Sequence, residues 1–550
     1  MSERLPKILA LDDETLILMT IRRSLMGTYD VTECQTVEQA LEAFRKSHFD
    51  LVITDIMMGQ VDGFKFRDMI RTMNSDIPII FLSSLMDDSG SSLLLHVMED
   101  SYSYFLRKGA SKVQLQAKIE QALSISRPQA ELKTLRLRFD RNLALASQIQ
   151  QVMLPPWVQC TPEYEYCFAY KPLERVSGDL FEWIPIGDGS FVGVFGDISG
   201  HGVHAALSMV AIETILRPQL LQAKDVHSLK PNAILQELNR FFCEKLNGVT
   251  NMTCLVSIWN FRQNTVTYQR AGHPDLISID ARTSEIRNPN PQDLGNLTVG
   301  MSADTLYSED DNVVYRFSDD EVFLSHTDGL DDLGTVDSPY GGIDNATFQE
   351  ILAAAIRSET ILALPHRLLS ALEQVGYNHQ IDDCFLWVLR KPPVSVDEEL
   401  CLTLPPDNVQ ADQAVIQASD FVRKRCQSDA LATKTGLLLS ECLANIIKHG
   451  ASNTALRSSD RIAIQLNNEP SCVRITVFDR CVGWDTSKLT QGNQSEIDRL
   501  LADLNRMKSD SGRGIPIMRT LSPQIQHREL AGVNETIFRI PKAEPQSATT

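Results

Sequence analysis

Short apolar runs alternate with segments of helical periodicity over the first part of the chain, residues 1–125. This alternation predicts a parallel sheet flanked by helices, as in a doubly wound α/β domain. The predicted central strands are residues 8–11, 51–54 and 77–82.

A strongly helical segment without glycine follows between Pro128 and Pro155. Its apolar positions alternate spacings of three and four, as in the seam of a coiled coil, and Asn142 would be the polar residue that sets the register. A single amphipathic helix packed on the next domain explains the same pattern, because the seam is short. We expect a helical linker over residues 126–156, with the seam Leu132, Leu135, Phe139, Asn142, Ala146, Ile149 and Met153.

Two further segments are long enough to form cores of their own, residues 157–391 and residues 395–545. The first contains strand-like runs at 322–324 and 385–389, and the second contains an apolar helix near residues 440–450. The chain is therefore predicted to be multidomain, of the α/β and α+β classes.

The composition limits the possible function. The net charge of −19 argues against binding nucleic acid or an anionic membrane through a generally basic surface, although a local basic patch is compatible with it. The 11 cysteines are scattered without a C-x-x-C pair, so we expect reduced, mostly buried thiols and no structural zinc site. Because no apolar run is long enough to cross a bilayer, we expect a soluble, cytoplasmic protein.

Acidic residues follow two predicted strands of the first segment, as Asp12-Asp13 and Asp55. The carboxyl ends of parallel strands line the ligand crevice of an open sheet. Three carboxylates there can hold Mg²⁺, and one of them can act as nucleophile toward a phosphoryl group. Ser83 ends the next strand, and Lys108 follows a later apolar run.

This set of residues resembles a two-component receiver domain. The resemblance implies that Asp55 is the phosphoacceptor and that Asp12 and Asp13 bind magnesium with it. It also implies that Ser83 and Lys108 contact the phosphoryl group.

The choice of Lys108 rather than Arg107 depends on aligning Phe105 with the aromatic switch residue of the family. Gly59 and Gly109 stand where the family usually has proline. We expect these glycines to change loop rigidity and to leave the chemistry intact. A receiver fold that serves only as a docking module is the alternative.

Four acidic motifs at predicted strand ends mark the segment 157–391. Hard cations prefer carboxylate and carbonyl oxygens, and the glycines beside these acids let the backbone turn tightly. A single Asp-Gly pair is usually only a turn, but four separated acids could converge on a metal pair. The motifs are Ser177-Gly178-Asp179, Gly196-Asp197-Ile198-Ser199-Gly200-His201-Gly202, Thr327-Asp328-Gly329 and Asp382-Asp383.

Together with residues 149–155 and 271–274, these motifs resemble the metal-dependent protein phosphatase (PPM) family, in its sporulation-type and stress-type branch. The resemblance covers about residues 145–391 and implies an α/β/β/α sandwich with two Mn²⁺ or Mg²⁺ ions. It places Asp197 between both ions. It assigns Asp328 and Asp382 to one ion, and Asp179 and the Ile198 carbonyl to the other.

The implied reaction is hydrolysis of a phosphoserine ester, in which two cations neutralise the dianion and activate a shared water. Asp383 stands where the wider family often has asparagine, so we expect it to support Asp382 rather than to bind metal. His201 and His273 invite a general-acid interpretation. His201 lies in the tight turn around Asp197, where a structural role is expected.

The last segment carries an apolar helix on which Glu441, Asn445 and His449 are predicted to share one face. A carboxylate and an amide in this register can orient a hydroxyl group and hold nucleotide-bound magnesium. The motifs that follow contain Asp479, Gly483, Gly512, Gly514 and Thr536.

This order resembles the GHKL ATPase fold, an α/β sandwich, and particularly the serine kinases that double as anti-sigma factors. The resemblance implies ATP as cofactor, Asn445 as magnesium ligand and Glu441 as base. Asp479 would read the adenine amino group with Thr536 nearby, and the glycines would shape the lid and the phosphate loop. Cys481 replaces the first glycine of the usual Asp-x-Gly-x-Gly, so weakened ATP binding is an alternative.

The predicted function is that of a partner-switching response regulator controlled by phosphorylation of Asp55. Its phosphatase domain, through Asp197, would remove phosphate from a serine of a STAS-type anti-sigma-factor antagonist, and its kinase domain, through Glu441, would add it back. Sigma-factor-dependent transcription would respond. Alternatively, the C-terminal domain sequesters a sigma factor or the antagonist, and the phosphatase is the only active enzyme.

The expected partners include an upstream sensor histidine kinase and the STAS-type antagonist, with an anti-sigma factor or sigma factor as a further candidate. A second copy of the chain is expected to pair through the receiver and linker. No nucleic acid and no membrane are expected. Histidine-kinase activity is disfavoured, because neither the linker helix nor residues 391–440 contain a phosphoacceptor histidine.

Overall fold

The computed structural model describes residues 5–58, 62–83, 100, 102–187, 189–200, 202–222, 229–246, 250–357, 360–392, 399–450, 460–481 and 514–542. The chain divides into two compact units, Met1–Asn142 and Leu143–Thr550.

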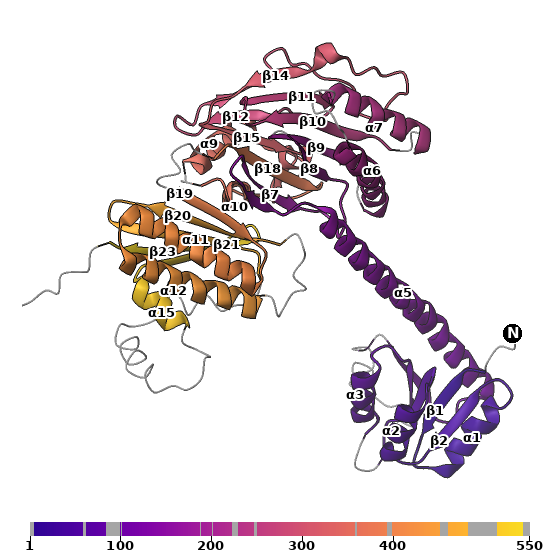
Figure 1. Cartoon of the computed structure of the whole chain (residues 1–550). Coiled ribbons are helices and arrows are strands. Elements are labelled where there is room, and N and C mark those ends of the chain that lie inside the picture. The colour runs from indigo at the N-terminus through magenta and orange to yellow at the C-terminus, as the bar shows by residue number, and fades with distance from the viewer. Residues whose placement is uncertain are drawn as a thin grey trace, which may run out of the picture. The chain divides into compact units, whose positions relative to one another are not determined.

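The first unit contains a five-stranded parallel sheet in the order β2-β1-β3-β4-β5, with helices on both faces (Figure 1). Strands β3 and β4 are buried along their whole length, which explains their continuous apolar sequences. The predicted doubly wound receiver fold is confirmed. Its elements are β1 Lys7–Leu11, α1 Thr15–Leu25, β2 Asp30–Cys34, α2 Val37–Lys46, β3 Leu51–Asp55, α3 Gly63–Met73, β4 Ile79–Ser83, β5 Ser103–Arg107 and α5 Lys112–Met153.

Helix α5 differs from the linker helix that the sequence predicts. It begins at Lys112, so Pro128 lies inside it and does not start a new helix. Leu115 and Ile119 at its beginning are buried against the receiver sheet. The expected linker is therefore the second part of a helix whose first turns belong to the receiver core.

The phosphatase-like part of the second unit is a sandwich of two antiparallel sheets. The sheet β14-β11-β10-β9-β8 faces the sheet β13-β12-β15-β18-β7-β6. Helices α6 and α7 pack on the first sheet and α10 on the second, as Figure 1 shows. The predicted α/β/β/α sandwich is confirmed.

Along the chain the strands alternate between the two sheets: β6 and β7 belong to the second sheet, β8 to β11 and β14 to the first, and β12, β13, β15 and β18 to the second. The elements are β6 Val158–Cys160, β7 Glu165–Lys171, β8 Leu180–Gly187, β9 Ser190–Ile198, α6 Val203–Gln222, α7 Pro231–Lys245, β10 Met252–Asn260, β11 Thr265–Ala271, β12 Ile277–Asp280, β13 Ile286–Arg287, η2 Glu309–Asp311, β14 Val313–Arg316, β15 Glu321–His326, α8 Asp328–Asp331, β16 Gly334–Thr335, α9 Asn345–Ile356, α10 Leu364–Gln374, β17 Tyr377–His379 and β18 Cys384–Arg390.

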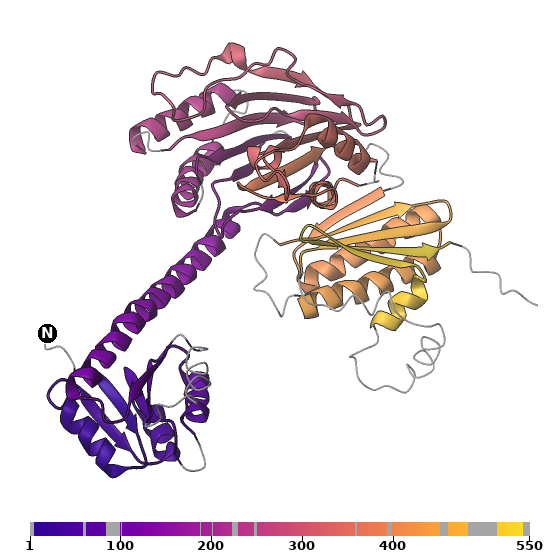
Figure 2. The ribbon, with the colours of Figure 1, turned by 180° about the vertical axis from the view of Figure 1, so that it is seen from behind.

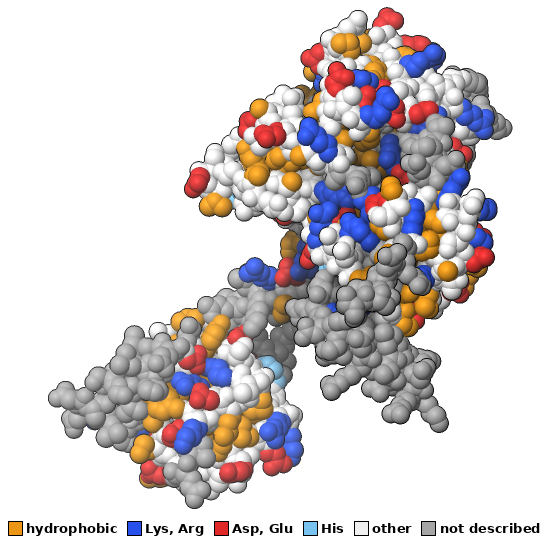
Figure 3. All heavy atoms as spheres, turned by 90° about the vertical axis from the view of Figure 1, so that its left-hand side faces the viewer, with side chains coloured by type: hydrophobic (Ala, Val, Ile, Leu, Met, Phe, Trp, Pro, Cys, Tyr) orange, Lys and Arg blue, Asp and Glu red, His pale blue; other side chains and the backbone are white. Residues whose placement is uncertain are grey.

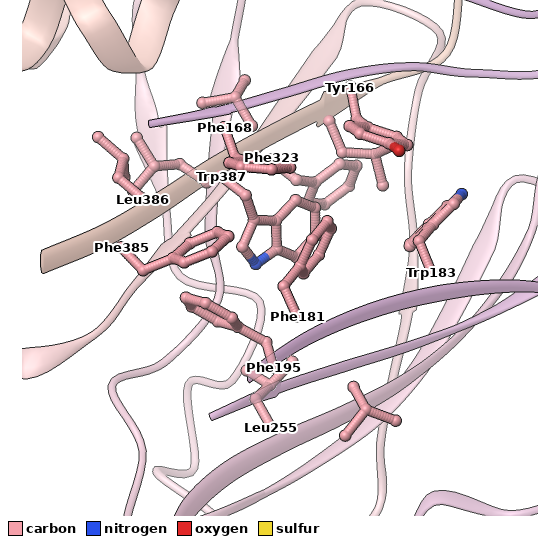
Figure 4. Packing of buried hydrophobic residues seen from close by; sticks show 14 of the residues in the cluster. Tyr166, Phe168, Phe181, Trp183, Phe195, Leu255, Phe323, Phe385, Leu386 and Trp387 are labelled. Carbon is pink, nitrogen blue, oxygen red and sulfur yellow. The ribbon is translucent and has the colours of Figure 1, made fainter. Parts of the chain in front are cut away.

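Aromatic side chains fill the space between the two sheets, as Figure 4 shows. The Trp387 ring lies 6.3 Å from that of Trp259 at 79°, and 4.8 Å separates the rings of Trp259 and Phe323. Edge-to-face contacts of this kind add to the free energy of burial. The rigid core holds the ends of β8, β9, β15 and β18, where the acidic motifs lie.

The C-terminal part contains a five-stranded antiparallel sheet in the order β19-β20-β21-β23-β22. Helices α11, α12 and α15 cover one face, as the view from behind in Figure 2 also shows. The predicted α/β sandwich is confirmed. Its elements are β19 Glu399–Leu404, α11 Asn408–Cys426, α12 Asp429–Asn445, a π-helical turn Ile446–Gly450, β20 Ile462–Asn468, β21 Cys472–Asp479, α15 Gly514–Leu521, β22 Ile525–Leu530 and β23 Val533–Pro541.

One stretch of the described chain, Asp429–Lys448, is long and apolar enough to cross a membrane by length and composition. Leu438, Leu439 and Leu443 of α12 are buried in the domain core. Packing of this helix against the sheet accounts for its apolar sequence.

Within the second unit, side chains of the C-terminal sheet contact the phosphatase sandwich. The Arg480 guanidinium lies 4.7 Å from the Trp157 ring and donates to the Phe168 carbonyl at 3.1 Å. The Trp157 indole N–H donates to the Arg461 carbonyl at 3.0 Å, and Arg367 forms an ion pair with buried Glu535. These contacts join the two parts into one compact unit.

Candidate functional sites

The receiver carboxylates meet at the carboxyl ends of β1 and β3. Carboxylate oxygens of Asp12, Asp13 and Asp55 all lie within 4.8 Å of one another. Asp12 and Asp55 are buried, and Asp13 is exposed. Burial raises the pKa of Asp12, against the lowering effect of the Glu14 backbone N–H and of Lys108. The cluster offers an anionic, partly open oxygen site that a divalent cation fits.

Lys108 bridges this cluster. Its Nζ lies 2.6 Å from Asp55 Oδ2 and 3.0 Å from Asp12 Oδ2. Ser83 ends β4, and its carbonyl accepts from the Lys108 backbone N–H at 2.8 Å. Phe105 lies in β5 opposite Phe81, while Arg107 is exposed. The geometry thus brings Lys108, and not Arg107, to Asp55. Gly59 lies outside the described residues, and Gly109 has a φ of 84° that suits glycine.

The phosphatase acids come from four strand ends. Asp179 precedes β8, Asp197 and Ile198 end β9, Asp328 follows β15 and Asp382 precedes β18. Strands β8 and β9 pair with Leu180 opposite Gly196, which puts Asp179 beside Asp197. Strands β15 and β18 pair with His326 opposite Leu386, which brings the other two acids to the same end of the second sheet.

Two glycines permit the close approach of these loops. A Cβ on Gly178 would lie 2.6 Å from the Ile198 carbonyl oxygen and 3.1 Å from Asp197 Oδ1. A Cβ on Gly329 would lie 1.9 Å from the Asp383 carbonyl oxygen. Any side chain would push the acidic loops apart.

The carboxylates repel one another in a buried setting. Burial first, and then Asp328, raise the pKa of Asp197 to about 8. Burial and the charge of Asp197 raise the pKa of Asp179 well above its usual range, and burial and Asp382 raise that of Asp328. Among the described residues, Asp179 Oδ1 and Asp328 Oδ1 are buried without a hydrogen-bond partner. Unpaired buried oxygens and mutual repulsion are the signature of a site that divalent cations would neutralise.

Asp383 has a different environment from its neighbour. Its carboxylate accepts from the backbone N–H groups of Leu173 at 2.7 Å and Gly178 at 3.2 Å. Asp382 Oδ1 accepts from the Asp383 backbone N–H at 2.8 Å. Asp383 therefore holds the loop that carries Asp179.

Gln150 holds the same loop and was not predicted as a site residue. Its side-chain amide donates to the Ser177 carbonyl at 2.5 Å, and its Oε1 accepts from the Ser177 N–H at 3.1 Å. Ser177 Oγ in turn donates to Asp179 Oδ2 at 3.2 Å. Gln150 is only 2% exposed, although it lies in the last turns of α5. The long helix thus ends in a two-bond clamp next to Asp179.

His273 does not fit the general-acid interpretation. It is buried, its ring packs on Phe195 at 4.9 Å, and its Nδ1 lies 2.8 Å from the Pro274 carbonyl. Burial lowers the pKa of His273 to about 3, so the imidazole stays neutral at physiological pH. His201 lies outside the described residues.

The C-terminal part brings Glu441, Asn445 and Gly514 together. A Cβ on Gly514, at the start of α15, would lie 2.7 Å from Glu441 Oε2 and 3.2 Å from Asn445 Nδ2. Asn445 Nδ2 is buried without a hydrogen-bond partner in the described chain. The α-helix ends at Asn445 and continues as a π-helical turn, so the regular spacing does not extend to His449 as the sequence suggested.

Asp479 ends β21 and is 1% exposed. Its Oδ1 accepts from the Asn534 side chain at 3.0 Å and from the Cys481 N–H at 2.9 Å. Its Oδ2 is buried with no partner among the described residues, and burial raises the pKa of Asp479 to about 6. Thr536 lies on the neighbouring strand β23, with its hydroxyl 2.9 Å from His527 Nδ1. Asn534 was missed because only its register opposite Asp479 reveals it.

Cys481 does not strain the backbone. The described non-glycine residues with positive φ do not include it, so this position needs no glycine. Its side chain is 7% exposed and packs in the domain core, and burial raises the pKa of the thiol to about 12. The expected lid and loop residues Gly483 and Gly512 lie outside the described residues.

The face of the molecule in Figure 3 carries Lys and Arg side chains interspersed with Asp and Glu and with apolar groups. No uniformly basic surface is visible on the described residues of this face.

Family models match three consecutive segments of the chain. The response regulator receiver domain matches residues 8–120, stage II sporulation protein E (SpoIIE) matches residues 187–392, and the histidine kinase-like ATPase domain matches residues 404–540. The chain is thus a multidomain signalling protein that combines a receiver, a SpoIIE-type protein phosphatase domain and a kinase-like ATPase domain. This order confirms the resemblances drawn from the motifs.

Curated relatives align with the receiver. The probable transcriptional regulator ycf27 of Porphyridium aerugineum is 37% identical over 119 residues, which are 21% of this chain and 48% of the relative. The two-component response regulator ARR2 of Arabidopsis thaliana is 36% identical over 104 residues, 18% of this chain and 15% of the relative. The chain spans at most about half the length of these relatives.

Two solved structures are similar to larger shares of the chain. The RsbU and RsbW domains of a Mycobacterium tuberculosis protein are 21% identical, with 70% of this chain and 94% of that chain covered and a TM-score of 0.37. The SiaA-PP2C domain of Pseudomonas aeruginosa is 20% identical, with 46% and 98% covered and a TM-score of 0.39.

Proposed function

We propose that this chain is a receiver-controlled serine phosphatase whose C-terminal domain is an opposing serine kinase for the same partner. The partner would be a STAS-type anti-sigma-factor antagonist, so that a sigma factor is released or sequestered in response to a sensor histidine kinase. The succession of receiver, phosphatase and kinase-like segments supports a phosphorylation-controlled regulator. The choice of partner follows from the resemblance of the motifs.

In the receiver, Asp55 would accept the phosphoryl group, and Asp12 and Asp13 would hold Mg²⁺ with it. The close cluster of the three carboxylates supports this assignment. Lys108, which already contacts Asp55 Oδ2, would pair with the new phosphate, while Ser83 and Phe105 respond to it.

In the phosphatase, Asp197 would contact two Mn²⁺ or Mg²⁺ ions. Asp328 and Asp382 would complete the ligands of one ion, and Asp179 and the Ile198 carbonyl those of the other. Bound ions would supply charge neutralisation of the phosphoserine and an activated water. The unpaired oxygens of Asp179 and Asp328 support this ligand set.

The clamp between Gln150 and Ser177 supports the proposal that the receiver controls the phosphatase. Helix α5 is continuous from Lys112 to Met153. Leu115 and Ile119 in its first turns pack in the receiver core, and Gln150 near its end holds the backbone next to Asp179. A rotation or shift of α5 would move Ser177 and with it a metal-binding carboxylate. Leu135, Phe139 and Ile149 of α5 are exposed in the single chain, as expected if a second copy of the helix pairs with them.

In the C-terminal domain, Asn445 would hold Mg²⁺ of bound ATP and Glu441 would act as base toward the substrate serine. The partnerless Asp479 Oδ2 suits the adenine amino group, with Thr536 nearby, and Gly514 leaves room beside Glu441 and Asn445. Gly483 and Gly512 are proposed to shape the lid. The backbone at Cys481 does not need glycine.

The test uses full-length protein with a serine-phosphorylated and an unphosphorylated STAS partner. Phosphate on the partner is followed with Mn²⁺ alone and with Mg²⁺ and ATP. We expect Asp197→Ala to abolish removal and Asn445→Ala to abolish addition, each leaving the other reaction intact. Retained removal in Asp197→Ala would refute the phosphatase assignment. A protein that fails to bind ATP would favour the sequestering domain.

A further inference from the structure

Three metal-ligating side chains meet outside the sites described above. They are Cys160 at the end of β6, Glu165 at the start of β7 and Cys401 in β19, and their ligand atoms all lie within 4.8 Å of one another. β6 is the edge strand of one phosphatase sheet, and β19 is the edge strand of the C-terminal sheet. Cys160 and Cys401 are partly exposed as residues, and Glu165 is buried.

A short connection along the chain and several hydrogen bonds hold β6, β7 and β19 close together. β18 ends at Arg390 and β19 begins at Glu399, with only residues 391–398 between them. The Arg390 guanidinium donates to Glu165 Oε2 at 2.7 Å and to Glu399 Oε1 at 3.1 Å. The Cys160 backbone N–H donates to the Thr403 hydroxyl at 3.3 Å. The three ligands are thus held in register by bonds on both sides.

The formal charges around the three ligands do not sum to zero. Two carboxylates, Glu165 and Glu399, face one guanidinium, that of Arg390, so the formal charge is −2 + 1 = −1. The side chains are 5%, 16% and 14% exposed respectively, and such shielded charge is costly unless it is paired. Protonated thiols add no charge. A divalent cation that displaces two thiol protons also leaves the total at −1, so it can enter without charge build-up.

We propose that Cys160, Cys401 and Glu165 bind Zn²⁺, with Glu399 as fourth ligand, and that the ion staples β6 to β19. Two thiolates select zinc over Mg²⁺ and Mn²⁺, which prefer oxygen. In a tetrahedral zinc site, neighbouring ligand atoms lie about 3.5–4 Å apart, so the observed cluster has to close by about 1 Å or less. Glu399 Oε1 already lies 3.2 Å from Cys401 Sγ, and Arg390 orients both carboxylates.

The positions of the ligands along the chain explain why the sequence does not indicate a zinc site. Its ligands come from three strands of two domains, so no C-x-x-C spacing occurs. The proposal therefore revises the expectation, drawn from the scattered cysteines, that this chain has no structural zinc site.

Cobalt substitution tests the site in the full-length protein. Reduced, chelator-treated protein is titrated with Co²⁺, and thiolate-to-cobalt charge-transfer absorption is recorded in the near ultraviolet. The phosphatase and receiver ligands are oxygen atoms, so cobalt bound there gives no such band. We expect the band in the wild type, its displacement by Zn²⁺, and its loss in Cys160→Ser and Cys401→Ser. Cys243→Ser and Cys426→Ser, which also remove partly exposed thiols, should keep it.

A second measurement on the wild type avoids reliance on variants that fail to fold. Zn²⁺ should protect Cys160 and Cys401 from alkylation while Cys243 stays reactive, as peptide mass spectrometry can show. Absence of both the band and the protection would overturn the proposal. So would a Cys160–Cys401 disulfide in the native protein together with no zinc binding after its reduction.

Discussion

The substitution Gln150→Leu removes the clamp between helix α5 and the Asp179 loop while nearly conserving side-chain volume. Two hydrogen bonds to Ser177 are lost, and the buried N–H and carbonyl of Ser177 lose their side-chain partner. Each stranded group costs about 1–3 kcal/mol, so the two together cost the loop about 2–6 kcal/mol of support. Loss of an outer contact of this kind usually weakens metal binding about 10–100-fold.

The assay is the rate of phosphopeptide dephosphorylation as a function of Mn²⁺ concentration. We expect the half-saturating Mn²⁺ concentration to rise about 10–100-fold, with much of the rate recovered at saturation. Gln148→Leu, an exposed change two residues earlier on the same helix, is the matched control and should behave as the wild type. An unchanged half-saturating concentration in a folded Gln150→Leu variant would refute the role of the clamp.

Other predictions address the remaining sites. Gly178→Ala forces a Cβ to within 2.6 Å of the Ile198 carbonyl, so we expect a loss of about 100-fold or more in phosphatase rate, measured at saturating Mn²⁺. The pKa of about 8 for Asp197 in the metal-free protein lies above its unfolded value, so stability falls as pH rises toward 8. The melting temperature of the metal-free protein should therefore decrease between pH 5 and 8. The half-saturating Mn²⁺ concentration should also decrease over this range, because fewer protons compete with the metal for the carboxylates. If neither quantity changed with pH, the carboxylate cluster would be contradicted. Asp479→Asn should weaken ATP binding about 10–100-fold by calorimetry and leave dephosphorylation unchanged. Asp55→Ala should abolish labelling by acetyl phosphate; persistent labelling would place the phosphoacceptor elsewhere.

The sequence predicts well those parts of the fold in which acidic residues stand at the ends of apolar strands. Asp12 and Asp55 follow buried strands, and the parallel order of those strands brings them together. Asp179 and Asp197 likewise mark strand ends with adjacent glycines. The fold class and the position of the acidic sites can therefore be predicted from the apolar runs and from the acids that end them.

Features that depend on tertiary contacts were missed. Gln150 and Ser177 are separated by 27 positions, and their bonds involve the Ser177 backbone, so the sequence does not reveal this contact. Helix α5 begins at Lys112, ahead of the helical segment that the sequence marks between Pro128 and Pro155, because Leu115 and Ile119 pack against the receiver sheet. The register of the apolar helix past Asn445 changes at a π-helical turn that periodicity does not reveal.

If the receiver controls the phosphatase as proposed, the rate of dephosphorylation depends on the state of Asp55. The most direct measurement is the initial rate at which the full-length protein dephosphorylates the proposed substrate, a serine-phosphorylated STAS protein, with and without beryllofluoride at limiting Mn²⁺. We expect beryllofluoride to change this rate in the wild type, and to have no effect in Asp55→Ala or in Gln150→Leu. Equal rates with and without beryllofluoride in the wild type, with bound beryllofluoride verified, would contradict the account.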